Sequence, residues 1–216
     1  MTPIATGSAA RGGVRVARDA VALTFDDGPD PVWTPRMLDE LRRADASATF
    51  FVEAPRALAN PGLVETLVEA GHEVGFHCVA HRRHSELERD EVRAEAVVGM
   101  AMLTSLGVRP RAWRAPWGVV TEVTREVAAE HGLELWNWSF DSHDWRGDRC
   151  EEMLGALAAA GGLEGGTVAL MHDALGPGAR RPDCAETVRL TRALLGNARA
   201  QGLRTVRLSG PAAVTS

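Results

Sequence analysis

Short apolar runs alternate with longer amphipathic segments along the whole chain. The short runs are rich in β-branched and aromatic residues, which is typical of strands, whereas the longer segments show the helical repeat. Seven strands are predicted: Val21–Phe25, Ala48–Val52, Glu73–Phe76, Arg111–Trp113, Leu133–Trp138, Thr167–Met171 and Leu203–Leu208. Because parallel neighbours need crossover helices, the alternation predicts an α/β fold with a mostly parallel sheet. Seven strands suit a closed or nearly closed (β/α) barrel, and an open doubly wound sheet is the alternative.

Three of the helical segments carry start signals. These are Thr34-Pro35 before Met37–Ala44, a Ser85 and Glu88 capping box for Leu87–Leu106, and Thr121 before Glu122–His131. The chain has no internal repeat and no linker long enough to divide it. We therefore expect an N-terminal arm over residues 1–20 and a single domain over residues 21–216.

The composition excludes several kinds of chemistry. The 216 residues include 24 basic ones, all of them arginine, and 29 acidic ones, which gives a net charge of −5. Without lysine the chain can form neither a Schiff base nor the phosphate grip of a P-loop, and without tyrosine it has no phenolic acid or nucleophile. A pI near 5.8 argues against nucleic acid as a partner. The pairs Arg82-Arg83 and Arg180-Arg181 are interpreted as solvent-exposed charges.

The N-terminus and the cysteines indicate the compartment. Residues 1–20 lack the apolar core of a secretory signal. The chain also lacks an apolar stretch of about 18 residues, the length needed to span a membrane. We therefore expect a cytoplasmic protein with no membrane partner. Cys78, Cys150 and Cys184 are widely spaced and form no CxxC pair, so neither a disulfide framework nor a thiolate zinc site is expected.

Two adjacent carboxylates, Asp26 and Asp27, follow the first predicted strand and precede Gly28-Pro29. Side by side at the end of a strand, they repel each other unless a cation or an arginine stabilises them. The alternative interpretation is a turn built by aspartate side chains, which are common in such positions.

Two histidines, His77 and His81, follow the third predicted strand. Their spacing brings both imidazoles to one side if the chain turns helically after His77. Two neutral histidines and one carboxylate are a common ligand set for catalytic zinc, and this set leaves a position open for water. The alternative is a pair of structural histidines. His84, one turn further on, is assigned to the surface.

Three further motifs follow the later strands. Arg114 stands beside two tryptophans and can hold a carboxylate, although a structural salt bridge is the alternative. Asp141 and Asp144 follow the fifth strand, and His172 follows the sixth. A histidine with a carboxylate nearby is a candidate general acid, because the carboxylate raises its pKa and keeps it protonated. Since all five motifs come after strands, we expect them to meet at one barrel mouth, where they provide what metal-assisted hydrolysis requires.

The five motifs, taken in this order, resemble those of a known family. They are TFDDGP at 24–29, HxxxH at 77–81, RAPWG at 114–118, DSHDW at 141–145 and LMHD at 170–173. From about Val21 to about Arg207 the chain is similar to the polysaccharide deacetylases of carbohydrate esterase family four, the nodulation-protein homology domain. The resemblance implies a distorted, incomplete (β/α) barrel with about seven parallel strands. It also implies a divalent metal held by Asp27, His77 and His81. Zinc is expected there, and Co, Mn, Fe or Ni can occupy such a site.

The resemblance also implies roles for the other motif residues. Five would be catalytic: Asp26 as general base, Arg114 holding Asp26 ionised, His172 as general acid, Asp144 orienting His172, and Asp141 assisting. Three would bind substrate: Trp117, whose backbone N–H polarises the amide carbonyl, and Trp145 and Leu170, which shape the acyl pocket.

Two positions depart from the family pattern. Cys78 stands where relatives usually carry serine or threonine, and Trp117 stands where tyrosine is frequent. We predict a metal-dependent hydrolase of non-peptide C–N (amide) bonds that deacetylates an N-acetylated amino sugar or a small sugar-containing metabolite. The alternatives are a metal-dependent cyclase or dehydratase of a biosynthetic intermediate, and a catalytically silent carbohydrate-binding homologue. The oligomeric state stays open.

Overall fold

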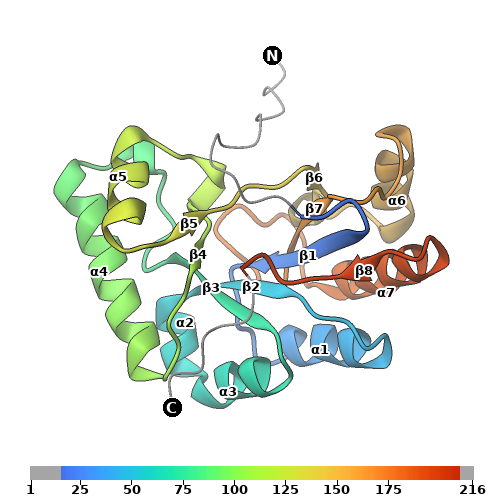
Figure 1. Cartoon of the computed structure of the whole chain (residues 1–216), viewed down its shortest axis with the longest axis horizontal. Coiled ribbons are helices and arrows are strands. Elements are labelled where there is room, and N and C mark those ends of the chain that lie inside the picture. The colour runs from blue at the N-terminus through green and yellow to red at the C-terminus, as the bar shows by residue number, and fades with distance from the viewer. Residues whose placement is uncertain (1–15, 210–216) are drawn as a thin grey trace.

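The computed structural model of the chain describes residues 16–209 (Figure 1). Within this range the strands are β1 Ala20–Asp26, β2 Thr49–Glu53, β3 Glu73–Cys78, β4 Ala112–Trp113, β5 Glu134–Leu135, β6 Phe140–Asp141, β7 Val168–His172 and β8 Arg204–Thr205. The α-helices are α1 Trp33–Arg43, α2 Ala54–Ala59, α3 Pro61–Glu69, α4 Arg89–Ser105, α5 Glu122–Glu130, α6 Cys150–Ala159 and α7 Ala185–Ala200. Short 3-10 turns cover His84–Glu86, Pro116–Gly118 and Asp144–Arg146. Most of the predicted arm over residues 1–20 lies outside the described residues.

The strands form one parallel sheet in the order β5-β4-β3-β2-β1-β7-β6, with β8 paired to the start of β1. Helices connect most of the successive strands and lie around the curled sheet (Figure 1). This arrangement is an incomplete (β/α) barrel, which confirms the predicted fold class. Because every pairing is parallel, the carboxyl ends of the strands meet at one end of the barrel.

The predicted strand Leu133–Trp138 is wrong as a single strand. Its start, β5, pairs with β4, and the chain pairs again further on as β6, this time with β7. The backbone N–H of Trp136 donates to the carbonyl of Trp113 at 2.9 Å, and that of Ser139 donates to Val168 at 3.0 Å. Residues 136–139 therefore join the two edges of the sheet, which local apolar pattern alone does not indicate.

The central strand β1 is buried along its whole length. A strand covered on both faces has a nearly continuous apolar sequence, which explains why Val21–Phe25 is recognisable as a strand. Phe25 stacks on Phe50 of β2 with ring centroids 4.9 Å apart. The burial holds the end of β1 firmly, so that the two aspartates that follow have a fixed position.

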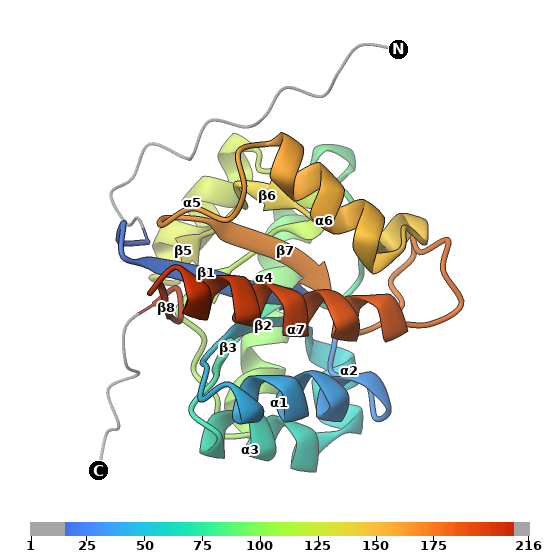
Figure 2. The ribbon, with the colours of Figure 1, turned by 90° about the vertical axis from the view of Figure 1, so that its right-hand side faces the viewer.

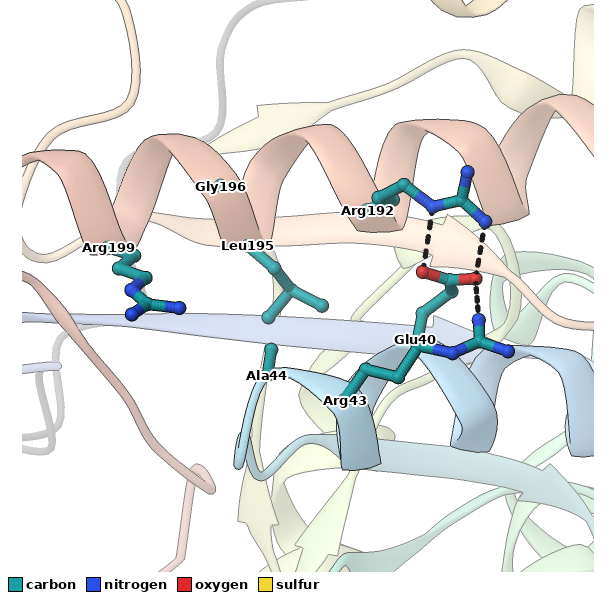
Figure 3. A pocket seen from close by; sticks show the side chains of 7 residues that line it. All are labelled: Glu40, Arg43, Ala44, Arg192, Leu195, Gly196 and Arg199. Carbon is teal, nitrogen blue, oxygen red and sulfur yellow. Dashed lines mark hydrogen bonds and ion pairs between the residues drawn. The ribbon is translucent and has the colours of Figure 1, made fainter.

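Helices α1 and α7 pack side by side (Figure 2). The nearly buried Glu40 of α1 accepts hydrogen bonds from Arg192 at 2.9 and 2.7 Å and pairs with Arg43 (Figure 3). A cavity of about 250 Å³ lies beside this ion pair, and none of the predicted site residues lines it. We therefore interpret it as a cleft between packed helices that lies outside the catalytic region.

The predicted helix starts are partly correct. Thr121 caps α5, since its hydroxyl accepts from the backbone N–H of Thr124 at 3.2 Å. The predicted Ser85 cap is wrong, because α4 begins later, with Glu88 as its N-cap and Glu91 as the reciprocal partner. No helix of the described residues is both long enough and apolar enough to cross a membrane.

Candidate active site

The structure brings the polar residues that follow β1, β3, β4 and β7 together at one end of the sheet. Asp26 at the end of β1 is the register partner of His172 at the end of β7. Asp27 has a left-handed backbone with φ of 73°, which ends the alternation of the strand. Both aspartates are buried, so their charges need partners inside the protein.

Asp27 lies against the two histidines of the second motif. Its Oδ1 is 3.3 Å from Nε2 of His77 and 3.4 Å from Nε2 of His81. Nδ1 of His77 lies 2.7 Å from the carbonyl oxygen of Arg114. Because a carbonyl only accepts, Nδ1 carries the proton in the neutral ring, and the lone pair of Nε2 faces Asp27.

These three residues have the properties of a metal-ligand set. One ligand atom from each of Asp27, His77 and His81 lies within 4.8 Å of the others. Oδ1 of Asp27 is buried and has no hydrogen-bond partner within the described residues. Burial would raise the pKa of Asp27, but contact with His77 and the charge of His172 hold it well below its usual range. An ionised carboxylate facing two imidazole nitrogens is a donor set that a divalent metal satisfies.

Asp26 is held by a fully buried arginine. Nη1 of Arg114 donates to Oδ1 of Asp26 at 2.8 Å and to the hydroxyl of Thr24 at 2.7 Å. The remaining nitrogens of the guanidinium donate to the carbonyls of Trp136 and Asn137. Burial lowers the pKa of Arg114, and the charge of Asp26 opposes this shift. The pair keeps Asp26 oriented in a site from which water is largely excluded.

His172 forms a dyad with Asp144. Nδ1 of His172 lies 2.7 Å from Oδ1 of Asp144, and the backbone N–H of His172 donates to Oδ2 at 2.9 Å. Burial would lower the pKa of His172, but the charge and the hydrogen bond of Asp144 outweigh it and raise the pKa to about 9. The imidazole is therefore protonated at neutral pH, as a general acid must be.

Comparison with known proteins identifies the family. The polysaccharide deacetylase family model matches residues 13–136. A peptidoglycan-N-acetylglucosamine deacetylase of Bacillus cereus is 31% identical over 191 residues, which are 88% of this chain and 86% of that protein. The chain belongs to the polysaccharide deacetylase family. A chitooligosaccharide deacetylase of Bradyrhizobium is 35% identical over 164 residues, 75% of this chain and 74% of that protein. The family 4 carbohydrate esterase from Streptomyces lividans, solved in complex with acetate, superposes with a TM-score of 0.78 at 29% identity, covering 89% of this chain and 94% of that one.

These similarities confirm the predicted family and enzyme class, a polysaccharide deacetylase. The roles of the individual residues in this polysaccharide deacetylase stay predictions. The structure shows which of these residues lie in contact. Asp27, His77 and His81 lie together, Arg114 contacts Asp26, and Asp144 contacts His172.

Two residues assigned to the solvent are buried in this deacetylase. Arg181 is 8% exposed, and its Nη1 donates to Oδ2 of Asp144 at 2.8 Å. His84 is 3% exposed and lies 2.9 Å from the hydroxyl of Thr124. Both assignments were wrong because the partners lie 37 and 40 residues away in the sequence. Within the Arg180-Arg181 pair, only Arg180 is exposed.

The predicted substrate-binding residues lie in different environments. Trp117 is 40% exposed, has a left-handed backbone with φ of 60°, and stacks against the guanidinium of Arg83 at 4.4 Å. Trp145 is half-buried beside His143, and Leu170 is buried in β7. Asp141 accepts from the backbone N–H of His143 at 2.8 Å, and no hydrogen bond of the described residues links it to His172.

The loop between β7 and α7 covers the site. A β-carbon added to Gly176 would overlap Oδ2 of Asp27, and one added to Gly178 would lie 2.8 Å from the Trp117 ring. Arg56 donates to the carbonyl of Leu175 at 2.9 Å, and Arg181 donates to the carbonyl of Ala174 at 3.2 Å. The start of the loop is thus held by two arginines, while Gly176 lies against Asp27 and Gly178 against Trp117.

Asp173 is a buried carboxyl for which the sequence indicated no role. The hydroxyl of Thr34, predicted to cap α1, instead donates to Asp173, while Val32 occupies the N-cap position. A β-carbon at Gly28 would overlap the Asp173 carboxyl, so the turn after Asp27 packs directly on it. Burial raises the pKa of Asp173 to about 7. It supports the turn that carries Asp26 and Asp27.

Proposed function

We propose that this chain is a metal-dependent N-deacetylase that removes acetyl groups from N-acetylated amino sugars in a saccharide. The observation that supports it most is the convergence of a ligand set with two oriented dyads. Asp27, His77 and His81 form the ligand set, and Arg114–Asp26 and Asp144–His172 form the dyads. Amide hydrolysis needs a proton acceptor for the attacking water and a proton donor for the departing amine, and the dyads provide one of each.

Asp27, His77 and His81 would hold the metal. Zinc suits an aspartate and two histidines, and cobalt, manganese, iron or nickel have the same access to this donor set. When bound, the ion supplies Lewis-acid chemistry, since it polarises the amide carbonyl and acidifies water.

Asp26 would act as the general base. Arg114 contacts Oδ1 and orients the carboxylate, which would take a proton as the water oxygen bonds to the amide carbon. Because Arg114 is also fixed by Thr24 and two backbone carbonyls, it holds the base in one orientation.

His172 would act as the general acid. Its Nδ1 proton is held by Asp144, so Nε2 is the atom that can give a proton to the amine nitrogen as the C–N bond breaks. The products are acetate and a free amino sugar. Arg181 and Thr187 hydrogen-bond the other oxygen of Asp144 and fix the dyad.

The substrate class is supported by the relatives and by the aromatic residues at the site. Two relatives carry the names of peptidoglycan-N-acetylglucosamine and chitooligosaccharide deacetylases. Trp117 presents a partly exposed indole beside His81, with ring centroids 5.0 Å apart, and a partly exposed indole is suited to packing against a sugar. Because Gly176 and Gly178 cover the site, we propose a short saccharide or a small sugar-containing metabolite rather than the interior of a polymer.

The test is acetate release from N-acetylglucosamine oligomers of defined length and from small N-acetylated sugars, with zinc or cobalt added. Chelation should abolish release, and metal should restore it. Asp26→Asn and His172→Ala should each lower kcat by about 10²–10⁴-fold. Activity that survives both substitutions would refute the roles. A saccharide that binds without turnover with any metal would favour the silent homologue, and a rearranged product without acetate would favour the cyclase or dehydratase.

A further inference from the structure

The backbone between His77 and His81 is hydrogen-bonded to a carboxylate of α4. Oε2 of Glu95 accepts from the backbone N–H of Val79 at 2.9 Å, and both oxygens lie 3.2 Å from the backbone nitrogen of Ala80. Successive backbone N–H groups that converge on one anion form a concave binding site for it. The half-buried Glu95 therefore fixes the backbone of the short segment that separates His77 from His81.

The histidine side chains at the two ends of this segment have a different partner from its backbone. The imidazoles of His77 and His81 both point to Asp27, with Nε2 atoms 3.3 and 3.4 Å from Oδ1. Their ring centroids are 5.1 Å apart. Val79 and Ala80 lie in the short segment that joins the two histidines. Their backbone conformation therefore sets the relative position of the two rings.

The two histidines differ in what else orients them. Nδ1 of His77 lies 2.7 Å from the carbonyl of Arg114. Nδ1 of His81 is buried and has no hydrogen-bond partner in the described part of the chain. The thiol of Cys78, also buried, makes no hydrogen bond within residues 16–209. His81 contacts Asp27, the His77 ring and the edge of the Trp117 indole, and its backbone is continuous with the segment that Glu95 holds.

We propose that Glu95 is a positioning residue for the metal site: it holds the Val79–Ala80 backbone so that His81 meets the metal together with His77 and Asp27. This inference rests on the proposed metal-dependent function. In this proposal Glu95 itself contacts neither the substrate nor the reacting atoms. Groups that orient metal ligands in this way change metal affinity by about 10–100-fold when they are removed.

The experiment measures metal affinity without turnover. Full-length protein is freed of metal by chelation and titrated with Co²⁺, with binding followed by visible absorption and zinc affinity obtained by competition. Glu95→Ala removes both acceptors, and the isosteric Glu95→Gln replaces one of them by a donor. Asp90→Asn is the matched control, since it removes one charge from the same helix at a side chain that is 98% exposed. Thermal unfolding of each metal-free protein is measured in parallel.

We expect Glu95→Ala to bind Co²⁺ about 10–100-fold more weakly, Glu95→Gln to be intermediate, and Asp90→Asn to match the wild type. The metal-free unfolding temperature of Glu95→Gln should stay close to that of the wild type, and saturating Co²⁺ should restore kcat with KM unchanged. Wild-type affinity in both Glu95 variants would overturn the proposal, as would an affinity loss that only follows a loss of metal-free stability. If the wild type binds Co²⁺ but releases no acetate, the proposed function fails while the affinity comparison still decides the role of Glu95.

Discussion

Arg181 and His172 share one carboxylate, that of Asp144. Nη1 of Arg181 lies 2.8 Å from Oδ2 of Asp144, and Nδ1 of His172 lies 2.7 Å from Oδ1. Arg181 also donates to the backbone carbonyls of His172 and Ala174. The same guanidinium therefore fixes the acid dyad and the start of the loop that covers the site, so the acid and the loop are expected to respond together when it is changed.

Replacement of Arg181 by glutamine should lower both stability and activity. The variant removes one of the two charged partners of the buried Asp144 and leaves it with His172; loss of a hydrogen bond to a charged group costs about 1.5–3 kcal/mol of unfolding free energy. Arg180→Gln alters the exposed neighbour and should change that free energy by less than about 0.5 kcal/mol. Urea unfolding of both variants provides the comparison. Equal stability of Arg181→Gln and Arg180→Gln would show that the buried pair contributes nothing.

Asp144→Asn should move the alkaline limit of the reaction to lower pH. Asp144 raises the pKa of His172 to about 9 against the effect of burial. Without that charge and hydrogen bond, only the charges of Asp27 and Asp26 oppose burial, and the pKa of His172 falls. The alkaline limb of kcat/KM should therefore lie at a lower pH in Asp144→Asn than in the wild type. The pH profile of acetate release measures this shift, with the partly exposed Asp148→Asn as control. An unmoved limb in Asp144→Asn would assign the acid to another group.

Local pattern predicts the strands and the motifs at their ends, because both are encoded in neighbouring residues. The buried strand β1 shows a continuous apolar run, and Asp26 and Asp27 interrupt it abruptly. Arg181 has no such signal, since it follows another arginine in a loop, and only its contact with Asp144, 37 residues away, distinguishes it. The division of Leu133–Trp138 likewise depends on pairing with β4 at one end and β7 at the other. The motifs therefore predict which residues meet at the end of the sheet, Arg114 and Asp144 among them, whereas Arg181 is recognised only in the structure.

Gly176→Ala should damage the site although it adds only a methyl group. A β-carbon there overlaps Oδ2 of Asp27, so either the loop or the carboxylate must move. A displacement of about 1 Å at a catalytic group lowers the rate on the order of 10²-fold. Gly155→Ala in α6 is the control, since its β-carbon meets nothing within 4 Å and favours the helix. Wild-type acetate release and metal affinity in Gly176→Ala would show that the loop moves away from Asp27 freely.

Asp173→Asn should remove part of the pH dependence of stability. The pKa of Asp173 is raised by burial from 3.8 to about 7 in the folded protein. Between these values the folded protein keeps a proton that the unfolded chain has lost, so stability falls as pH rises, by up to about 1.4 kcal/mol per pH unit. Asparagine keeps an acceptor for the hydroxyl of Thr34 but does not titrate. We therefore expect the unfolding free energy of the variant, relative to that of the wild type, to rise from pH 4 to pH 7 and to stay constant above pH 7.

Urea unfolding of the chelator-treated proteins across this pH range measures this difference in free energy, in which the contributions of the other titrating groups cancel. Parallel stability curves would mean that Asp173 ionises normally in the folded protein, and that Gly28 packs against a carboxylate and not against a neutral acid.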